Sequence, residues 1–319
     1  MTGFLLWRGG IFLKHNMEPI INEYFSCHQA LLATYASYQK RNYDMIFSES
    51  WGFGYQKDDN PFGSSLNPSC QDRRRILLEK FHGIKTEDRK YEGIKNLLEI
   101  IQSTLTHSPI LLFCDVFNCP WNIAYRRNHI DHYVLITGLD YSAKQVNILD
   151  PYSTKDENTI DVEKIAPCDG NLSFFIMKPL QKPKEEDYHF EIVNSCDHIK
   201  KSDFMQSLES FCNDMQIRFD ELLHVEYTDE YAIPLIINLR RIANQRYCYC
   251  IFLNHLVDKK MIASYMLEIM ESIAEKYALL RILLIKQILK KRKSVECTDI
   301  LNEIMSKEYE AYENMKSFI

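Results

Sequence analysis

The sequence has few of the features that mark secreted or membrane proteins. The apolar segment Phe4–Trp7 is broken by Arg8 and is followed by no small-residue cleavage site, so no secretory signal is predicted. Ten cysteines without such a signal predict a reduced, cytoplasmic setting in which most thiols are buried. The apolar segment Tyr277–Lys286 is interrupted by charged residues, which favours a core helix over a membrane span.

The sequence also lacks the patterns of metal-binding and nucleic-acid-binding proteins. It contains no Cys-x-x-Cys pair, and the pairs Cys114/Cys119 and Cys248/Cys250 have poor spacing for structural zinc. No metal and no cofactor are therefore expected. A net charge of −6 argues against nucleic acid as a partner, and the basic run Lys290–Lys293 is interpreted as the C-terminus of a helix.

The 319 residues are enough for two domains of ordinary size. Helices and strands are mixed before residue 184, whereas almost every later segment has helical periodicity. The junction Pro179–Asp187 is rich in proline and charge, as linkers are. We therefore predict an α+β domain at 1–183, with an antiparallel sheet, and an all-α domain at 184–319.

Periodicity and turn residues give the expected elements. In the first domain, helices are expected at 27–40, 44–49, 72–82 and 87–106, and strands at 110–115, 133–139, 145–150 and 172–177. In the second domain, helices are expected at 202–224, 230–256, 259–291 and 297–318.

Cys27 has the local sequence of a cysteine nucleophile. It follows Ser26, a good N-cap residue, and precedes the apolar run Ala30–Ala33, so its thiol is predicted at the first turn of a helix. The positive end of the helix dipole favours the nucleophilic thiolate. His132 leads into one predicted strand and Asp150 ends the next. A nucleophile, a base and a group that orients the base are what covalent catalysis requires, and Cys27, His132 and Asp150 supply them in order.

His129 is a rival to His132 as the base. On a strand, residues three apart point to opposite faces, so only one of the two can face Cys27. We assign the base to His132, because the apolar run Tyr133–Ile136 that follows it holds it better. His129 is expected at the entrance of the site.

Further residues are candidates for substrate binding. Backbone N–H groups near Cys27 and His28 are expected to hold a developing oxyanion, helped by the side-chain amide of Asn22 or Gln29.

Two aromatic segments are open to more than one interpretation. Asp115 ends a strand before a segment that contains Trp121, an arrangement that suits recognition of an amine substrate or simply caps a turn. The Gly-rich loop that begins at Trp51 has the same two interpretations, approach to a ligand or a plain turn.

At these residues the chain resembles the butirosin biosynthesis protein H family, whose members are papain-like proteins. The resemblance is carried by Ser26-Cys27-His28-Gln29-Ala30-Leu31, by the segment His129–Asp140, by Val146–Tyr152 and by Asp115 before its aromatic segment. It covers roughly residues 18–180, and the helical second half is similar to the domain that often follows in such proteins.

The resemblance implies a papain-like fold and an acyltransferase of natural-product assembly. Such an enzyme takes an acyl or aminoacyl group from a carrier-protein phosphopantetheine thioester, forms an acyl-cysteine at Cys27 and passes the group to an amine acceptor. Two alternatives remain open: hydrolysis of the same acyl-enzyme, and a non-catalytic scaffold that binds a carrier protein. The helical half also allows a homodimer.

Overall fold

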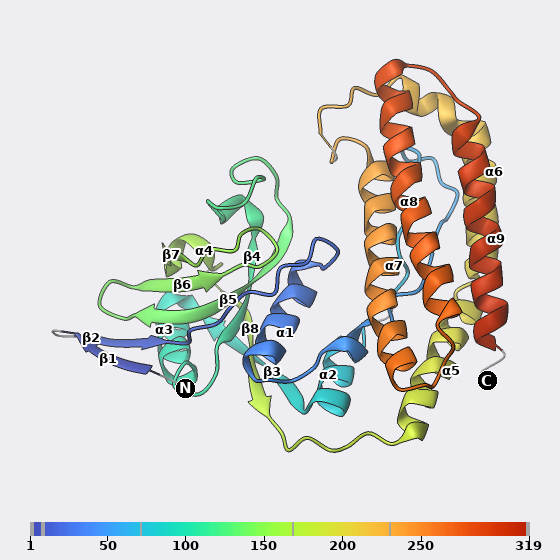
Figure 1. Cartoon of the computed structure of the whole chain (residues 1–319). Coiled ribbons are helices and arrows are strands. Elements are labelled where there is room, and N and C mark those ends of the chain that lie inside the picture. The colour runs from blue at the N-terminus through green and yellow to red at the C-terminus, as the bar shows by residue number, and fades with distance from the viewer. Residues whose placement is uncertain (1–2, 8–9, 71, 168, 230, 317–319) are drawn as a thin grey trace. The chain divides into compact units, whose positions relative to one another are not determined.

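The computed structural model describes residues 3–7, 10–70, 72–167, 169–229 and 231–316, and it confirms the α+β class. The chain forms two compact units (Figure 1). The first contains residues 1–43 and 75–182, and the second contains residues 44–74 and 183–319. The second boundary lies where the linker was predicted. The structure differs from the predicted division in residues 44–74, which interrupt the first unit and belong to the second.

The first unit is built on an antiparallel sheet with the strand order β1-β2-β5-β4-β8-β3, and β6 and β7 extend it from β5. The strands are β1 (Gly3–Trp7), β2 (Gly10–Lys14), β3 (Ile84–Glu92), β4 (Ile110–Asp115), β5 (Asp131–Asp140), β6 (Gln145–Leu149), β7 (Asn158–Asp161) and β8 (Asp169–Met177). The four strands predicted from the sequence correspond to β4, β5, β6 and β8.

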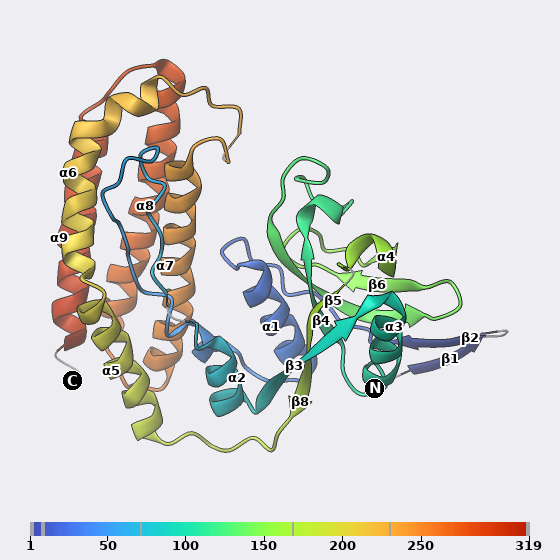
Figure 2. The same cartoon turned by 180° about the vertical axis from the view of Figure 1, so that it is seen from behind.

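Helices lie on both faces of this sheet (Figure 2). The helices are α1 (Cys27–Tyr38), α2 (Arg74–His82), α3 (Gly93–Thr104) and the short α4 (Val162–Ile165). The apolar side of α3 packs on the face of β4 and β5 that carries Leu112 and Val134. Helix α1 packs on the other face, where Tyr35 stacks on Phe175 of β8 at 3.8 Å. Because side chains alternate along a strand, this arrangement gives each face its own buried layer.

Helix α1 begins at Cys27 because a capping box fixes its start. The Ser26 side chain accepts a hydrogen bond from the Gln29 N–H at 3.3 Å, and the Gln29 side chain accepts one from the Ser26 N–H at 2.8 Å. The two residues therefore satisfy each other's backbone donors and hold the thiol in the first turn.

The segment 84–92 differs from the sequence prediction, which placed a helix at 87–106. Residues 84–92 form the edge strand β3, which pairs with β8 over its whole length, and helix α3 begins only at Gly93. Charged side chains are usual on an edge strand, where the outer face stays in water. These charged residues explain why the sequence did not predict a strand: Lys85–Lys90 shows no alternation of apolar and polar residues.

The second unit is a helical bundle. Its helices are α5 (Glu185–Lys201), α6 (Phe204–Leu223), α7 (Pro234–Asp258), α8 (Tyr265–Lys290) and α9 (Glu296–Lys316). The four later helices match the predicted ones within a few residues, except that the last prediction ends at residue 318, outside the described residues. Helix α5 is absent from the prediction: its first three residues fall in the predicted linker, and no element is predicted for 188–201.

Residues 44–74 lie against this bundle. They begin with the 3-10 helix η1 (Asp44–Phe47), where a longer stretch at 44–49 had been predicted as helical. The loop that follows buries Trp51 and Phe53, whose rings contact Phe204 of α6. This loop therefore supplies part of the bundle's core.

Candidate active site

His132 and Asp150 form a buried pair in the first unit. His132 is the second residue of β5, and Asp150 directly follows β6, the neighbouring strand. The His132 Nε2 atom lies 2.8 Å from Asp150 Oδ2, and the side chains are 3% and 0% exposed. Pairing of β5 with β6 thus places a carboxylate directly behind the imidazole, which is the position an orienting group needs.

This pair holds His132 in its protonated form. Burial alone lowers the pKa of His132, but hydrogen bonds and charge from Asp150 and Cys27 outweigh it and raise the pKa to about 10. Burial raises the pKa of Asp150, and the hydrogen bond and charge of His132 outweigh this and lower it. The imidazolium and carboxylate therefore stabilise each other across the neutral range.

The Cys27 thiol lies within hydrogen-bonding reach of the same imidazole. Because Nε2 is committed to Asp150, the nitrogen left for Cys27 is Nδ1. Cys27 is half-buried, so part of the residue remains exposed to solvent. Its own N–H belongs to the first helical turn, where an α-helix provides N–H donors without intrahelical partners. The structure thus brings the predicted Cys27, His132 and Asp150 together.

Trp121 supports Asp150 from a second direction. Its Nε1–H donates to Asp150 Oδ2 at 2.8 Å, so one carboxylate oxygen accepts from both the indole and the imidazole. Ser153 also helps to lower the pKa of Asp150, and its hydroxyl accepts from Asn122 Nδ2 at 2.7 Å, while Asp150 Oδ1 is buried without a hydrogen-bond partner among the described residues. Trp121 was predicted to contact substrate; in the structure its indole N–H binds the carboxylate of Asp150.

A pair of thiols with no predicted role lies beside His132. Cys114 is the β4 partner of His132 in the sheet, and its sulfur lies 3.9 Å from that of Cys119. Both residues are fully buried. A hydrogen bond to Cys119 and burial raise the pKa of Cys114, so that thiol stays protonated. The five-residue spacing suggested only a poor zinc motif and gave no sign of this position.

Asp115 and His129 form a separate, exposed pair. Asp115 Oδ2 lies 2.6 Å from His129 Nδ1, while its Oδ1 accepts from the N–H groups of Phe117 and Ile130. The His129 ring stacks on Phe117 at 4.3 Å. Asp115 thus caps the 3-10 helix η2 (Val116–Asn118), the turn-capping role that the sequence left open. His129 lies before β5 and is committed to Asp115.

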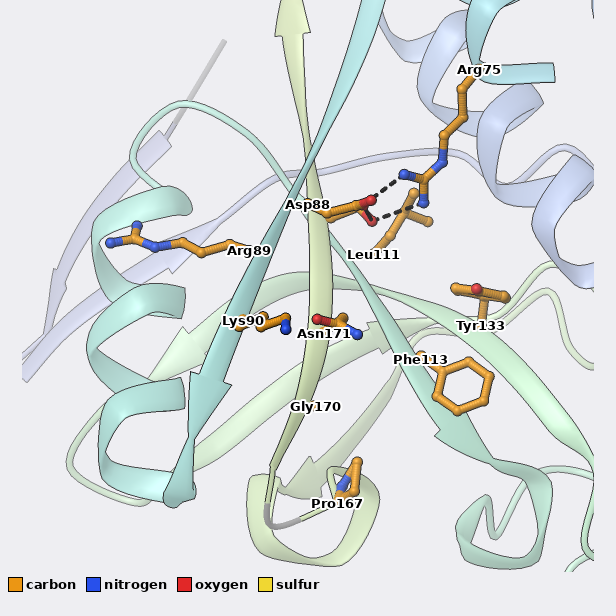
Figure 3. Close-up of a pocket in the computed structure, with 11 residues that line it drawn as sticks. Arg75, Asp88, Arg89, Lys90, Leu111, Phe113, Tyr133, Pro167, Gly170 and Asn171 are labelled. Carbon is orange, nitrogen blue, oxygen red and sulfur yellow. Dashed lines mark hydrogen bonds and ion pairs between the residues drawn. The ribbon is translucent and has the colours of Figure 1, made fainter. Parts of the chain in front are cut away.

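The remaining candidates around Cys27 have structural partners. Asn22 Oδ1 accepts from the Tyr24 N–H at 2.9 Å and so shapes the turn before the helix. Gln29 closes the capping box through its side-chain oxygen, and its prediction as an oxyanion donor, which concerns its amide N–H groups, stays a prediction. The buried His28 ring contacts that of Tyr133 at 5.1 Å, and Tyr133 lies beside Phe113 (Figure 3).

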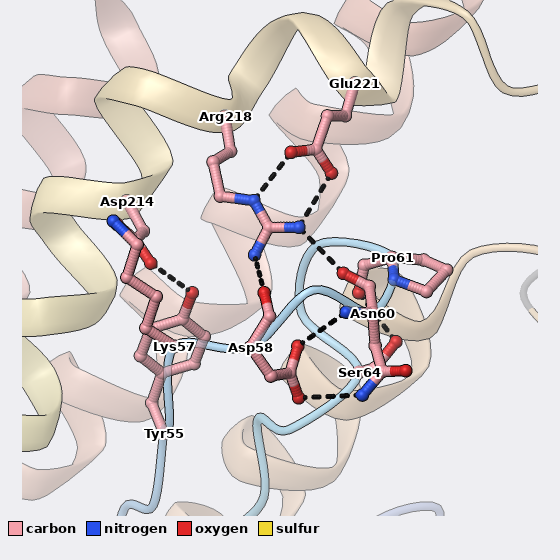
Figure 4. A network of polar contacts seen from close by, with 9 residues as sticks. All are labelled: Tyr55, Lys57, Asp58, Asn60, Pro61, Ser64, Asp214, Arg218 and Glu221. Atoms are coloured by element: carbon pink, nitrogen blue, oxygen red, sulfur yellow. Dashed lines mark hydrogen bonds and ion pairs between the residues drawn. The ribbon is translucent and has the colours of Figure 1, made fainter.

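Trp51 is buried in the core of the second unit, so its prediction as a substrate-binding residue is wrong. It is 1% exposed, and its Nε1–H donates to Glu308 Oε2 at 2.8 Å. Its loop is tied to the bundle again near Lys57, where the backbone carbonyls of Asp58 and Asn60 accept from Arg218 of α6 (Figure 4). Gly52 serves this packing, because a Cβ there would lie 2.5 Å from the Pro68 carbonyl oxygen.

Among the described residues, no group of three or more His, Cys, Asp or Glu side chains could hold a metal ion. Over the same part of the chain, none of the helices combines the length and apolar character needed to cross a bilayer. No protein-family model matches the chain, and comparison with curated proteins gives no match. The geometry of Cys27, His132 and Asp150 is therefore the basis for assigning a function.

Proposed function

We propose that this protein is a cysteine-dependent acyltransferase that moves an acyl group from a thioester to an amine through acyl-Cys27. The observation that carries the proposal is the buried His132–Asp150 pair, whose imidazole interacts with a thiol at the start of a helix. A structural histidine has no need of a buried carboxylate on one nitrogen and a half-exposed thiol near the other.

The order of the elements supports a papain-like fold for the first unit. The cysteine begins α1, the histidine lies on β5, and the aspartate directly follows the neighbouring antiparallel strand β6. This is the arrangement that the resemblance of residues 18–180 implies.

In the first step, the Cys27 thiolate attacks the thioester carbonyl. The oxyanion that forms is held by N–H donors at the first turn of α1. When the carbon–sulfur bond of the donor breaks, the imidazolium of His132 gives its proton to the departing thiolate. The products are a free thiol and acyl-Cys27.

In the second step, an amine attacks acyl-Cys27, His132 takes the proton of the amine, and Cys27 leaves as thiolate. The pKa of His132 suits this change of role. Part of its elevation comes from the hydrogen bond and charge of Cys27, and acylation removes that charge. His132 therefore gives up its proton more readily in the acyl-enzyme, where a base is needed.

The proposed donor is a phosphopantetheine thioester on a carrier protein, and the proposed acceptor is an amine of natural-product assembly. Both follow from the resemblance of the segments around Cys27, His132 and Asp150. A thioester suits the site chemically, because its thiol leaving group needs less protonation than the nitrogen of an amide.

The test is intact-mass analysis after incubation with an acyl thioester. The expected result is one acyl adduct that maps to Cys27, is absent in Cys27→Ala and persists in Cys70→Ala, the other half-buried cysteine among the described residues. Addition of an amine should discharge the adduct to an amide. Discharge to the free acid at the same rate with and without the amine would identify a hydrolase, and absence of any Cys27 adduct would overturn the proposal.

A further inference from the structure

A groove of about 810 Å³ lies on the sheet of the first unit (Figure 3). Its volume is within the range of small-molecule sites. Its walls come from four adjacent strands, β5, β4, β8 and β3, and it opens on the face against which α1 packs. Cys27 and His132 are not among its lining residues, so the groove is a feature separate from the triad.

A straight row of side chains crosses this groove from one strand to the next. Tyr133 of β5 pairs with Phe113 of β4, and Asn171 of β8 pairs with Lys90 of β3. Leu112 of β4 pairs with Leu172 of β8. Because these strands are antiparallel, Phe113 lies opposite Asn171, which joins the two pairs into one row. Three spacings between neighbouring strands, each about 4.8 Å, separate Tyr133 from Lys90, which gives a length of about 14 Å.

The two ends of the row differ in chemistry. At one end the rings of Tyr133 and Phe113 meet at 5.3 Å, and Phe113 is 36% exposed, unusually open for a phenylalanine. At the other end Lys90 is exposed beside Asn171 and makes no ion pair with any described residue. The groove therefore offers an aromatic surface at one end and an uncompensated cation at the other.

Two of the other charged groups that line the groove, Arg75 and Asp88, are paired with each other. Arg75 Nη1 lies 2.6 Å from Asp88 Oδ1, and its Nη2 donates to Ser173 Oγ at 3.0 Å. Arg89 also lines the groove, but it precedes Lys90 on β3, so its side chain projects from the opposite face, and Figure 3 shows it directed away from Asn171. Among the described residues that line the groove, Lys90 is thus the unpaired cation whose side chain lies on this face of the sheet.

The aromatic end of the row adjoins the catalytic helix. Tyr133 contacts the ring of His28 at 5.1 Å, and His28 directly follows Cys27. A ligand that lies along the row therefore has one end near the first turn of α1 and the other about 14 Å further along the sheet, at Lys90.

We propose that this groove binds the anionic end of an extended acyl-transfer substrate, with the anion at Lys90, the body over Phe113 and the reactive carbonyl toward Cys27. The proposal rests on the proposed function. The anion has two possible sources with the same chemistry: a phosphate on the arm that carries the thioester, or a carboxylate at the far end of the acyl group.

The test compares Lys90→Gln with Arg89→Gln, a neighbouring cation on the other face of the same strand. Three thioesters separate the sources: acyl-pantetheine, acyl-phosphopantetheine, and the pantetheine thioester of a dicarboxylic acid. Lys90→Gln is expected to raise the KM of Cys27 acylation about 5- to 10-fold for one of the two anionic thioesters and to leave the neutral one unchanged. Arg89→Gln should change none of them.

Equal effects of Lys90→Gln on neutral and anionic thioesters, or equal effects of the two variants, would overturn this inference while leaving Cys27 catalysis intact. If no thioester acylates Cys27, the proposed function fails, and calorimetry on Cys27→Ala then tests the groove directly. Phosphopantetheine or a free dicarboxylate should bind, with affinity weakened about 5- to 10-fold by Lys90→Gln and not by Arg89→Gln. Absence of binding by both anions would overturn the inference.

Discussion

His132 and Asp150 are joined at 2.8 Å in an interior where both side chains are almost fully buried. Two charges are costly to bury unless each compensates the other and the remaining polar atoms find partners. Here the two charges compensate each other and Trp121 adds a hydrogen bond to Oδ2, whereas Oδ1 is buried without a hydrogen-bond partner among the described residues. The pair fixes both the orientation of the imidazole and its protonated form, and these two consequences can be tested separately.

Replacing Asp150 by Asn keeps the shape of the side chain and removes its charge. The imidazolium of His132 then loses its main stabilising partner, so its pKa should fall. We expect the rate of Cys27 acylation to drop by about 10²- to 10⁴-fold. Single-turnover acylation followed by mass spectrometry measures this. A rate within about twofold of wild type would show that Asp150 has no orienting role.

Trp121→Phe tests the indole hydrogen bond, because it keeps an aromatic ring and removes only the N–H donor to Asp150. Acylation should slow by about tenfold, equivalent to about 1.4 kcal/mol. Trp51→Phe is the matched control: it removes an indole hydrogen bond to Glu308 in the second unit. It should lower stability and leave the acylation rate of the folded protein unchanged. Equal rate losses in both variants would indicate a general effect of tryptophan removal.

The pH dependence of stability follows from the raised pKa of His132. In the unfolded chain an imidazole titrates near 6.5, whereas in the folded protein this one titrates at about 10. The folded state therefore binds the extra proton, and the resulting stabilisation is fully present below pH 6.5 and lost as pH rises through about 10. Urea unfolding between pH 7 and 10 should show this decline in wild type and a smaller one in His132→Gln. Parallel curves for the two proteins would contradict the assignment.

The site residues could be predicted from sequence where a local signal exists. Ser26 and the apolar run after Cys27 indicate a helix start, and the structure has the capping box there. His132 and Asp150 each adjoin a run with strand character, and β5 and β6 are neighbouring strands. Their 2.8 Å contact needs only that pairing, which a short hairpin turn between the runs already favours.

Other features depend on contacts between distant segments, which leave no local signal. The aromatic loop at Trp51 has the composition of a binding loop. Its place in the bundle core depends on distant residues such as Glu308, which is 257 residues away in the sequence. The role of Trp121 likewise depends on a partner 29 residues later. The row from Tyr133 to Lys90 requires the order of four strands, and β3 was predicted as helix.

Alkylation of the native protein should select Cys27 among the described cysteines. Seven of these are buried, and the other half-buried one, Cys70, has its pKa raised to about 12 by burial, so it remains a thiol at neutral pH. Cys27 lies instead at a helix start beside the imidazolium of His132. Iodoacetamide at pH 7 should label Cys27 at least tenfold faster than Cys70. Peptide mapping measures both, and equal labelling would contradict an activated Cys27.

The loop of residues 44–74 makes the first unit difficult to isolate by simple truncation. A chain that ends at Lys182 keeps this loop and removes its partners: Trp51 loses Tyr249, and Phe53 loses Phe211 and Tyr277. Each large apolar side chain returned to water costs about 1.5–3 kcal/mol. We expect this truncated chain to aggregate.

The matched variant ends at the same residue and replaces residues 44–74 by a flexible Gly/Ser linker. Because residues 1–43 and 75–182 form one compact unit, this variant should be the more soluble of the two and should keep the His132–Asp150 pair. Soluble yield by size-exclusion chromatography compares them. Acylation of Cys27 in the soluble variant would locate the chemistry in the first unit, whereas equal solubility of both chains would show that the loop does not need the bundle.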